Sequence, residues 1–461
     1  MLAPVHRELT RICLINPRRD VWAKTEKTTL ALRECHKFLK AWYSPSLSLL
    51  TIAGLTPPAI EVEIVHEDFA PIDYTAGYDL VGITAMTQTI VRAYQIADEF
   101  RARGVYVVIG GSHATVMPQE AALHADTVVV GEAEELWPRF LQDFQNGEPL
   151  QVYRNPAGHY IDLTTSPSPR YDLLKGNQTL LDPLYFYNFV PVQASRGCPH
   201  DCEFCLVTGI YGKKPRKKTI LQIRNEIAAI KRSVPNRLIL FADDNLFIDR
   251  RFARELLVTL EELKVRWIGQ TDIAIGADEE LLRYIYRSGC VFLLIGFESL
   301  DPQNLAGMNR NDWKLRQLPN YEAHVRSIQE HGIVVFGSFI FGLDHDDQGV
   351  FSRVVDFMNR NQMTGQLTLA TPLPGSRMYE RLKEEDRFLY PEPFWERCTF
   401  LDATFRPKGM TTEQLEDGFV WAYRQIFNER AFRDRSAYFK EIYKQLARAR
   451  LRGLFTDQPL K

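Results

Sequence analysis

The sequence predicts an α/β protein with two parallel-sheet domains and a helical C-terminal tail. Short runs rich in Val, Ile and Leu alternate with segments of helical periodicity over residues 1–150 and again over residues 190–375. Strands that are apolar along their whole length and alternate with helices are typical of parallel sheets. Residues 151–189 lack this periodicity and are rich in turn formers, so we interpret them as a linker. Residues 376–461 show helical periodicity only.

The first domain places small and polar residues after its strands. Strands are predicted at residues 11–15, 61–65, 78–84, 105–109 and 125–130, and helices at residues 45–55, 90–103 and 134–144. Ligands of such sheets bind beyond the carboxyl ends of the strands. Hydroxyls and glycines occur there and favour a ligand site, although ordinary strand-to-helix turns use the same residue types: Thr84, Thr87, Gly110, Gly111 and Ser112.

The second domain repeats a strand and a helix in a way that is typical of a partial (β/α)6 barrel. Its strands are predicted at residues 190–194, 237–242, 266–271, 291–297, 334–341 and 366–370, and its helices at residues 221–232, 251–263, 279–288, 320–331 and 349–361. The active site of such a barrel lies at the carboxyl-end face. Polar side chains at these strand ends predict a ligand site: Asp243, Asp244, Gln270, Glu298 and Ser338.

Three cysteines follow the first strand of this barrel. Cys198, Cys202 and Cys205 have the spacing CxxxCxxC. Thiolates select iron–sulfur clusters, Zn²⁺ or Cu(I). A four-iron cluster needs four ligands, so three cysteines leave one iron open, as in a catalytic site. A structural zinc site is the alternative, but such sites normally show paired Cys-x-x-Cys knuckles or added histidines, and only His200 is close in sequence.

This motif, with the aromatic Phe204 before its last cysteine, resembles the signature of the radical S-adenosylmethionine (SAM) superfamily. The resemblance implies a [4Fe-4S] cluster on the three cysteines, with SAM bound to the open iron and cleaved to a 5′-deoxyadenosyl radical. It also implies an external electron donor of the flavodoxin or ferredoxin type. The residues expected to contact SAM are Phe204, Asp243, Asp244, Gln270, Glu298 and Ser338.

The stretches VGITAMT, VVIGGSHATVMPQEA and VVVGEAEELWP resemble the Rossmann-like cobalamin-binding domain of one branch of this superfamily. If cobalamin is bound, the resemblance implies contacts from Thr84, Thr87, Gly110, Gly111 and Ser112. The Asp-x-His-x-x-Gly motif is absent after the first strand, which excludes a cobalt-ligating histidine from that motif. The stretches TPLPGSRMYERLKEEDRFL and TFRPKGMTTEQLEDG resemble the tail of the subfamily that contains hopanoid methylases.

The tail itself is expected to cover the barrel. Thr411 and Gln414 predict a capping box at the start of a helix that runs through Phe427. Residues 438–451 predict a second helix, basic and with an apolar face, which we expect to pack on the barrel and not on a membrane surface.

The composition and charge of the chain limit the kinds of binding partner that we expect. The net charge of -2 gives no overall field that favours nucleic acid or an anionic membrane. The basic run at residues 213–218 is interpreted as a solvated loop with one residue near the carboxylate of SAM, so no nucleic-acid partner is expected. The sequence shows no signal peptide and no membrane span, and four of its seven cysteines are scattered, which together predict a cytoplasmic protein.

The favoured function is SAM-dependent alkyl transfer, most simply methylation of an unreactive carbon or phosphorus centre through methylcobalamin, with a small molecule or lipid as the acceptor. One alternative is cobalamin-independent transfer of another SAM fragment, such as 3-amino-3-carboxypropyl. A non-catalytic iron–sulfur sensor or RNA-binding protein is a second alternative. The sequence leaves the acceptor and the oligomeric state open.

Overall fold

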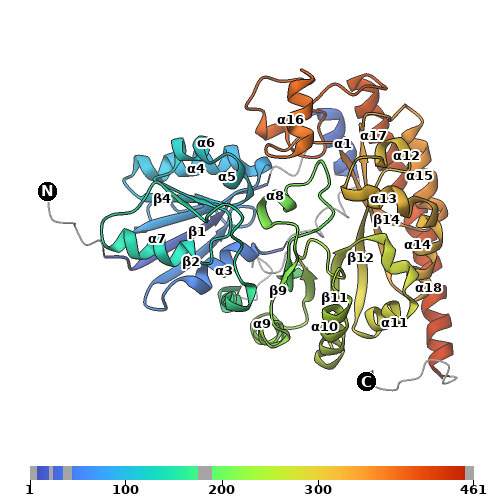
Figure 1. Cartoon of the computed structure of the whole chain (residues 1–461), viewed down its shortest axis with the longest axis horizontal. Helices are drawn as coiled ribbons and strands as arrows, with labels where there is room; N and C mark the ends of the chain where they lie inside the picture. The colour runs from blue at the N-terminus through green and yellow to red at the C-terminus, as the bar shows by residue number, and fades with distance from the viewer. Residues whose placement is uncertain (1–7, 20–23, 35–43, 175–188, 452–461) are drawn as a thin grey trace.

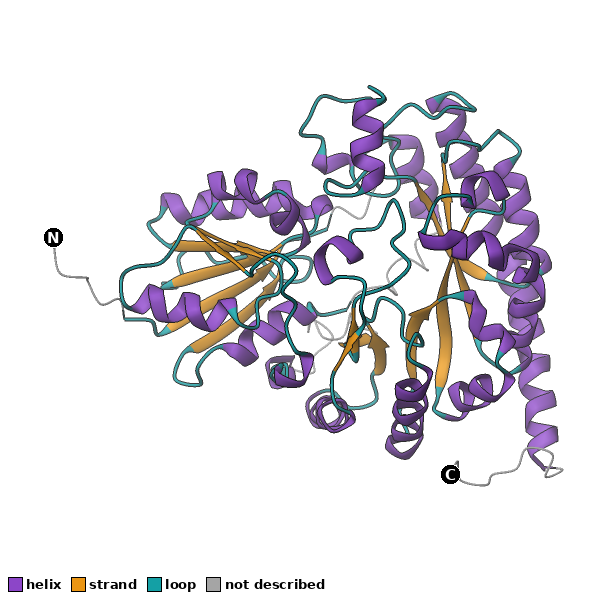
Figure 2. Ribbon diagram, viewed as in Figure 1, coloured by secondary structure: helices purple, strands orange, loops and turns teal. Residues whose placement is uncertain are grey.

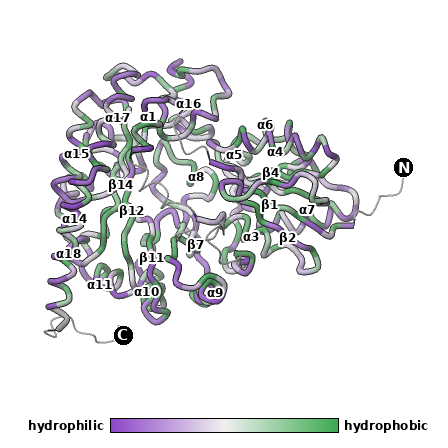
Figure 3. Tube along the Cα trace, turned by 180° about the vertical axis from the view of Figure 1, so that it is seen from behind, coloured by the Kyte–Doolittle hydropathy of each residue, from purple (hydrophilic) through white to green (hydrophobic). Residues whose placement is uncertain are grey.

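The computed structural model describes residues 8–19, 24–34, 44–174 and 189–451 of the 461-residue chain. Two sheets, each covered by helices, lie side by side, and the C-terminal helices flank the second sheet (Figure 1). Seen from behind, hydrophobic residues are concentrated along the strands of both sheets (Figure 3).

The N-terminal sheet is parallel throughout and has the strand order β2-β1-β3-β4-β5-β6. Its strands are β1 (Arg11–Asn16), β2 (Glu61–His66), β3 (Leu80–Thr84), β4 (Tyr106–Gly110), β5 (Thr127–Val130) and β6 (Val152–Arg154). Helices α3 (Leu47–Leu55) and α7 (Leu136–Gln145) pack on one face, and the other face is covered by α4 (Ile90–Ala102), α5 (Ser112–Val116) and α6 (Pro118–His124). The five predicted strands are therefore confirmed within one doubly wound sheet.

One strand lies where the sequence predicts a linker. Residues 152–154 form β6 and pair with β5 at the edge of the sheet. Only Tyr153 of this strand is buried, and three residues are too few to produce an alternating pattern. The remainder of the predicted linker includes short 3₁₀ turns at Leu163–Thr165 and Tyr171–Leu174, and its residues 175–188 lie outside the described residues.

The second sheet is also parallel, with the order β14-β13-β12-β11-β10-β7 (Figure 2). Its strands are β7 (Phe189–Val192), β10 (Leu238–Phe241), β11 (Trp267–Thr271), β12 (Cys290–Glu298), β13 (Val334–Phe341) and β14 (Thr364–Leu369). Its outer face is covered by α9 (Ile220–Ser233), α10 (Arg250–Leu263), α11 (Glu279–Arg287), α14 (Tyr321–Glu330) and α15 (Val350–Arg360), which enclose one large apolar core. Because β7 and β14 do not pair with each other, the barrel is open, as predicted.

The C-terminal part contains α16 (Arg377–Glu384), α17 (Thr412–Ile426) and α18 (Glu429–Leu451). The predicted capping box of Thr411 and Gln414 begins α17. Helix α18 starts earlier than predicted and buries Phe439, Ile442 and Leu446 against the barrel, which confirms that it docks there.

The N-terminal domain and the C-terminal part of the chain make two sets of contacts with each other's surroundings. Helix α1 (Glu26–Glu34), which the sequence analysis missed, packs on α17, where Glu34 pairs with Arg424 at 2.8 Å (Figure 1). In the other direction, Phe394 and Trp395 from the C-terminal part lie in the core of the N-terminal domain. These contacts hold the two sheets in a fixed relation.

Candidate active site

The three motif cysteines lie on a loop whose two ends pair with each other. Strands β8 (Ser195–Arg196) and β9 (Arg216–Lys217) pair antiparallel on either side of it, and the short helix α8 (Val207–Tyr211) follows Cys205. Gly197 at the base has φ +103°, and a Cβ there would lie 3.0 to 3.2 Å from three carbonyl oxygens of the same loop. Only glycine fits this backbone without strain.

Asp243 and Asp244, at the end of β10, anchor this loop. Asp243 is fully buried and accepts hydrogen bonds from the backbone N–H groups of Ala194 (3.0 Å) and Ser195 and from the Ser195 hydroxyl (2.6 Å). Burial raises its pKa to about 7, and the three donors oppose that rise. Both oxygens of Asp243 hold the loop, and its predicted contact with SAM stays a prediction. Asp244 accepts from the Gly197 N–H at 2.8 Å.

The thiols themselves suit a metal cluster. Burial raises the pKa of Cys198 to about 11, of Cys202 to about 12 and of Cys205 to about 11, so a bound cation is needed to hold them as thiolates at neutral pH. Their charges affect one another, which places the three thiols close together. No three His, Cys, Asp or Glu side chains among the described residues are placed to hold a single metal ion. Three thiolates that each bind a different iron of one cluster fit this arrangement.

A buried ion pair lies beside the cysteines. The Lys314 ammonium contacts the Glu298 carboxylate at 3.0 Å and the Gly296 carbonyl oxygen at 2.6 Å. Burial lowers the pKa of Lys314, but the Glu298 charge outweighs it and raises the pKa above its usual value. Glu298 has φ +65°, a left-handed conformation that is unusual for glutamate and common at functional sites. Sequence reasoning missed Lys314, because it lies in the short helix α13 (Trp313–Gln317), which carries no motif.

The other residues predicted to contact SAM are divided between two places. Gln270 and Ser338 lie on the inner face of the barrel sheet, in register with Leu294 and Gly296 of β12, and their side chains are partly exposed. Their contacts with SAM stay a prediction. Phe204 instead packs against the apolar cluster of Leu305, Met308, Leu343, Ala370, Met378, Leu382 and Phe405.

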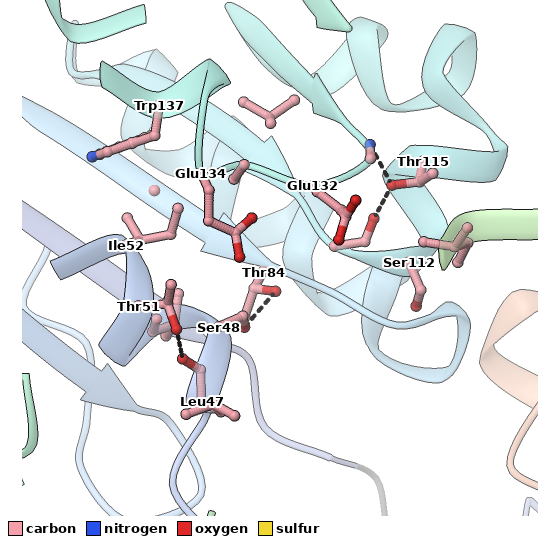
Figure 4. Close-up of a pocket in the computed structure, with 18 of the residues that line it drawn as sticks. Leu47, Ser48, Thr51, Ile52, Thr84, Ser112, Thr115, Glu132, Glu134 and Trp137 are labelled. Atoms are coloured by element: carbon pink, nitrogen blue, oxygen red, sulfur yellow. Dashed lines mark hydrogen bonds between the residues drawn. The ribbon is translucent and has the colours of Figure 1, made fainter. Parts of the chain in front are cut away.

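A cavity of about 340 Å³ lies between the carboxyl ends of the N-terminal strands and the cysteine loop (Figure 4). One end is apolar and is formed between the strands β1, β4 and β5 and the helices α3 and α7 by Leu14, Ile52, Leu55, Val108, Val129 and Trp137. Hydroxyl groups of Ser48, Thr51, Thr84, Ser112 and Thr115 line the other side. The wall toward the barrel comes from Gln193, Arg196, Ile210, Tyr211, Ala242 and Asp244.

Four of the five residues predicted to contact cobalamin line this cavity, namely Thr84, Gly110, Gly111 and Ser112. Thr87 is absent from the lining, because its hydroxyl is buried against Nδ1 of His113 at 3.1 Å. Gly111 has φ +99°, and a Cβ there would lie 2.6 Å from the Ala85 carbonyl oxygen. An apolar end for a ring system and hydroxyls for amide or phosphate groups fit part of a cobalamin molecule.

Ion pairs connect the two domains at the wall of the cavity that faces the barrel. The buried Glu132 of the N-terminal domain accepts from Arg196 at 2.6 Å and from Arg216 at 2.9 Å, and Arg196 also pairs with Glu134 at 3.0 Å. Arg196 and Arg216 form the β8–β9 pair at the base of the cysteine loop. Glu132 and Glu134, which follow β5, therefore fix the position of the cysteine loop relative to the cavity.

Comparisons with known proteins identify both halves of the chain. Residues 49–141 match the B12 binding domain family, and residues 192–358 match the Radical SAM superfamily. The chain is 31% identical over 398 residues to bacteriochlorophyllide d C-12(1)-methyltransferase of Chlorobaculum tepidum, covering 85% of this chain and 84% of that protein. The chain belongs to the radical SAM superfamily, in the branch that carries a B12-binding domain. The matched families imply a [4Fe-4S] cluster and SAM for the barrel, and cobalamin for the N-terminal sheet.

Further relatives agree with this assignment. Hopanoid C-2 methylase of Rhodopseudomonas palustris is 27% identical over 83% of this chain and 72% of its own length, which confirms the predicted resemblance. Among solved structures, TsrM from Kitasatospora setae, determined with cobalamin and a [4Fe-4S] cluster bound, has a TM-score of 0.62 at 17% identity and covers 84% of this chain and 80% of that chain. The latter similarity shows a shared fold.

Proposed function

We propose that this protein is a cobalamin-dependent radical SAM methyltransferase that methylates an unreactive carbon of a small molecule or lipid. The observation that carries the proposal is the shared wall between the two candidate cofactor sites. Arg196, Tyr211 and Asp244 line the cavity at the N-terminal sheet and at the same time belong to, or anchor, the cysteine loop. A methyl carrier in the cavity and a radical source on the loop would thus be neighbours.

The residues of this chain supply binding and orientation. When bound, the cluster with SAM supplies a 5′-deoxyadenosyl radical, and cobalamin supplies a methyl group. Asp243 and Asp244 hold the base of the cysteine loop through backbone N–H groups. We propose that the Glu298 carboxylate and the Gln270 amide bind the hydroxyls and ammonium of SAM. The Arg196 and Glu132 pair keeps the loop against the cavity.

The inner face of the barrel supports a largely apolar acceptor. Leu240, Leu294 and Ile340 are partly exposed on this face, beside the polar side chains of Gln270, Ser338 and Gln366. Two relatives are named for bacteriochlorophyllide d and for a hopanoid, both polycyclic and largely apolar compounds. We therefore propose an acceptor of this class, bound between the barrel sheet and the cavity.

The remaining assignments are proposed with the same function. A flavodoxin- or ferredoxin-type donor would deliver electrons, and the protein would work in the reducing cytoplasm, where an iron–sulfur cluster persists. None of the helices in the described part of the chain is long and apolar enough to cross a membrane. The domain boundaries 1–150, 151–189, 190–375 and 376–461 are supported by the family matches, which fall within the first and third ranges.

The test is a product analysis under anaerobic conditions. Reconstituted protein is incubated with SAM, hydroxocobalamin, a strong reductant and polycyclic acceptors, and the products are identified by mass spectrometry. The expected products are a methylated acceptor, S-adenosylhomocysteine from the SAM that gives its methyl group, and 5′-deoxyadenosine and methionine from the SAM that is cleaved. Transfer of a 3-amino-3-carboxypropyl group, with methylthioadenosine as coproduct and no bound cobalamin, would instead establish the fragment-transfer alternative.

A further inference from the structure

A short segment after β12 runs alongside the cysteine motif. The Met308 carbonyl oxygen accepts a hydrogen bond from the Glu203 N–H at 2.8 Å, and the Arg310 N–H donates to the His200 carbonyl oxygen at 2.8 Å. Between these two bonds lie Asn309 on one segment and Asp201 and Cys202 on the other. The backbone geometry therefore places Asn309 next to the cluster ligand Cys202.

The amide of Asn309 is oriented by the backbone beyond it. Its Oδ1 accepts from the Lys314 N–H at 3.4 Å, so its Nδ2 points the other way. Asn309 is 4% exposed, and its Nδ2 is buried with no hydrogen-bond partner in the described part of the chain. A buried amide donor without an acceptor is unfavourable and rare, and at a cofactor site it indicates that the acceptor belongs to the cofactor or its ligand.

A ring contact also holds this segment against the cysteine motif. Trp313 stacks on His200 with ring centroids 5.6 Å apart.

We propose that Asn309 donates an N–H···S hydrogen bond to the Cys202 thiolate of the cluster and thereby raises the reduction potential of the cluster. Reduction adds one electron from the flavodoxin- or ferredoxin-type donor, and a donor at the ligand sulfur stabilises the added negative charge. Asn309 would thus be a tuning residue that makes the cluster easier to reduce. The inference rests on the proposed cluster at Cys198, Cys202 and Cys205.

The test compares cluster potentials in a redox titration monitored by electron paramagnetic resonance. In Asn309→Leu the reduced-to-oxidised ratio at a fixed potential is expected to fall by about tenfold, equivalent to a midpoint lower by about 59 mV for one electron. Asn309→Asp, which keeps the shape but removes the donor and adds charge, is expected to lower the midpoint further. Iron and sulfide are measured in every preparation.

Asn304→Leu is the matched control. Asn304 is another buried amide of the same segment, but it bonds Asp346 at 2.7 Å and the His345 N–H at 2.9 Å, away from the cysteines. Its substitution should leave the midpoint unchanged. If both Asn309 variants carry a full cluster at the wild-type midpoint, the inference is wrong. If Asn309→Leu does not assemble a cluster, the midpoint potential of Asn309→Asp alone tests the inference. Wild-type protein without any cluster would refute the proposed function instead.

Discussion

Removal of the Glu132 charge should destabilise the junction between the two domains. The Glu132 side chain is 2% exposed and faces the guanidinium groups of Arg196 and Arg216, which are 12% and 16% exposed. Breaking a buried ion pair by removing one partner costs about 3–5 kcal/mol, because the other charge stays buried without compensation. In Glu132→Gln, Glu134 still pairs with Arg196 at 3.0 Å, so we expect a loss near the lower end, about 3 kcal/mol.

The measurement is urea-induced unfolding followed by tryptophan fluorescence, together with hydrogen exchange. Loss of the Glu132 charge should lower the unfolding midpoint and speed amide exchange in the β8–β9 pair, which Arg196 and Arg216 hold against the N-terminal domain. Glu262→Gln provides the control, because Glu262 also pairs with an arginine, Arg224, but is 56% exposed. An exposed pair contributes about 0–1 kcal/mol. Equal effects of the two substitutions would refute the claim that Glu132 joins the domains.

Three further outcomes follow from the site. Alanine at any of the three motif cysteines should abolish binding of iron and sulfide by elemental analysis, whereas Cys290→Ala, in the barrel core, should retain both; zinc in their place would contradict the cluster. Gly111→Leu should prevent cobalamin uptake in a spectroscopic titration, because its Cβ would lie 2.6 Å from the Ala85 oxygen, while the iron and sulfide content of the barrel should stay unchanged. Glu298→Ala should weaken SAM binding about tenfold to a hundredfold by calorimetry, as expected for a hydrogen bond to a charged group, and an unchanged dissociation constant would remove Glu298 from the site.

The strands of both sheets could be predicted because each is a buried apolar run. In β5, for example, all four residues of Thr127–Val130 are buried, and such a run followed by helical periodicity leaves little choice of structure. Elements that the sequence did not reveal are short or depend on distant partners. Helix α1 has a mixed polar sequence, and it is held by α17 through contacts between residues nearly 400 positions apart in the chain.

Position at a strand end predicted the right region but not the direction of each side chain. Asp243 and Asp244 are adjacent, and neighbouring residues at a strand end point in different directions. As a result Asp243 turns into the protein to hold Ala194 and Ser195, whereas Asp244 lines the cavity. Thr87 shows a related effect, since it lies beyond the strand in a 3₁₀ turn that directs its hydroxyl to His113.

The relation between the two cofactor sites could not be predicted from either domain alone. Glu132 follows a strand of the first domain, and Arg196 opens the cysteine motif of the second, so each resembles an ordinary polar residue at a strand end. Only the folded chain shows that they meet at 2.6 Å in the wall of one cavity. Because Arg196 is two residues from Cys198, a shift of the N-terminal sheet would move the first cluster ligand. The distance between the methyl carrier and the radical source is therefore set by buried charge pairs across the domain boundary, in addition to the packing of the two sheets.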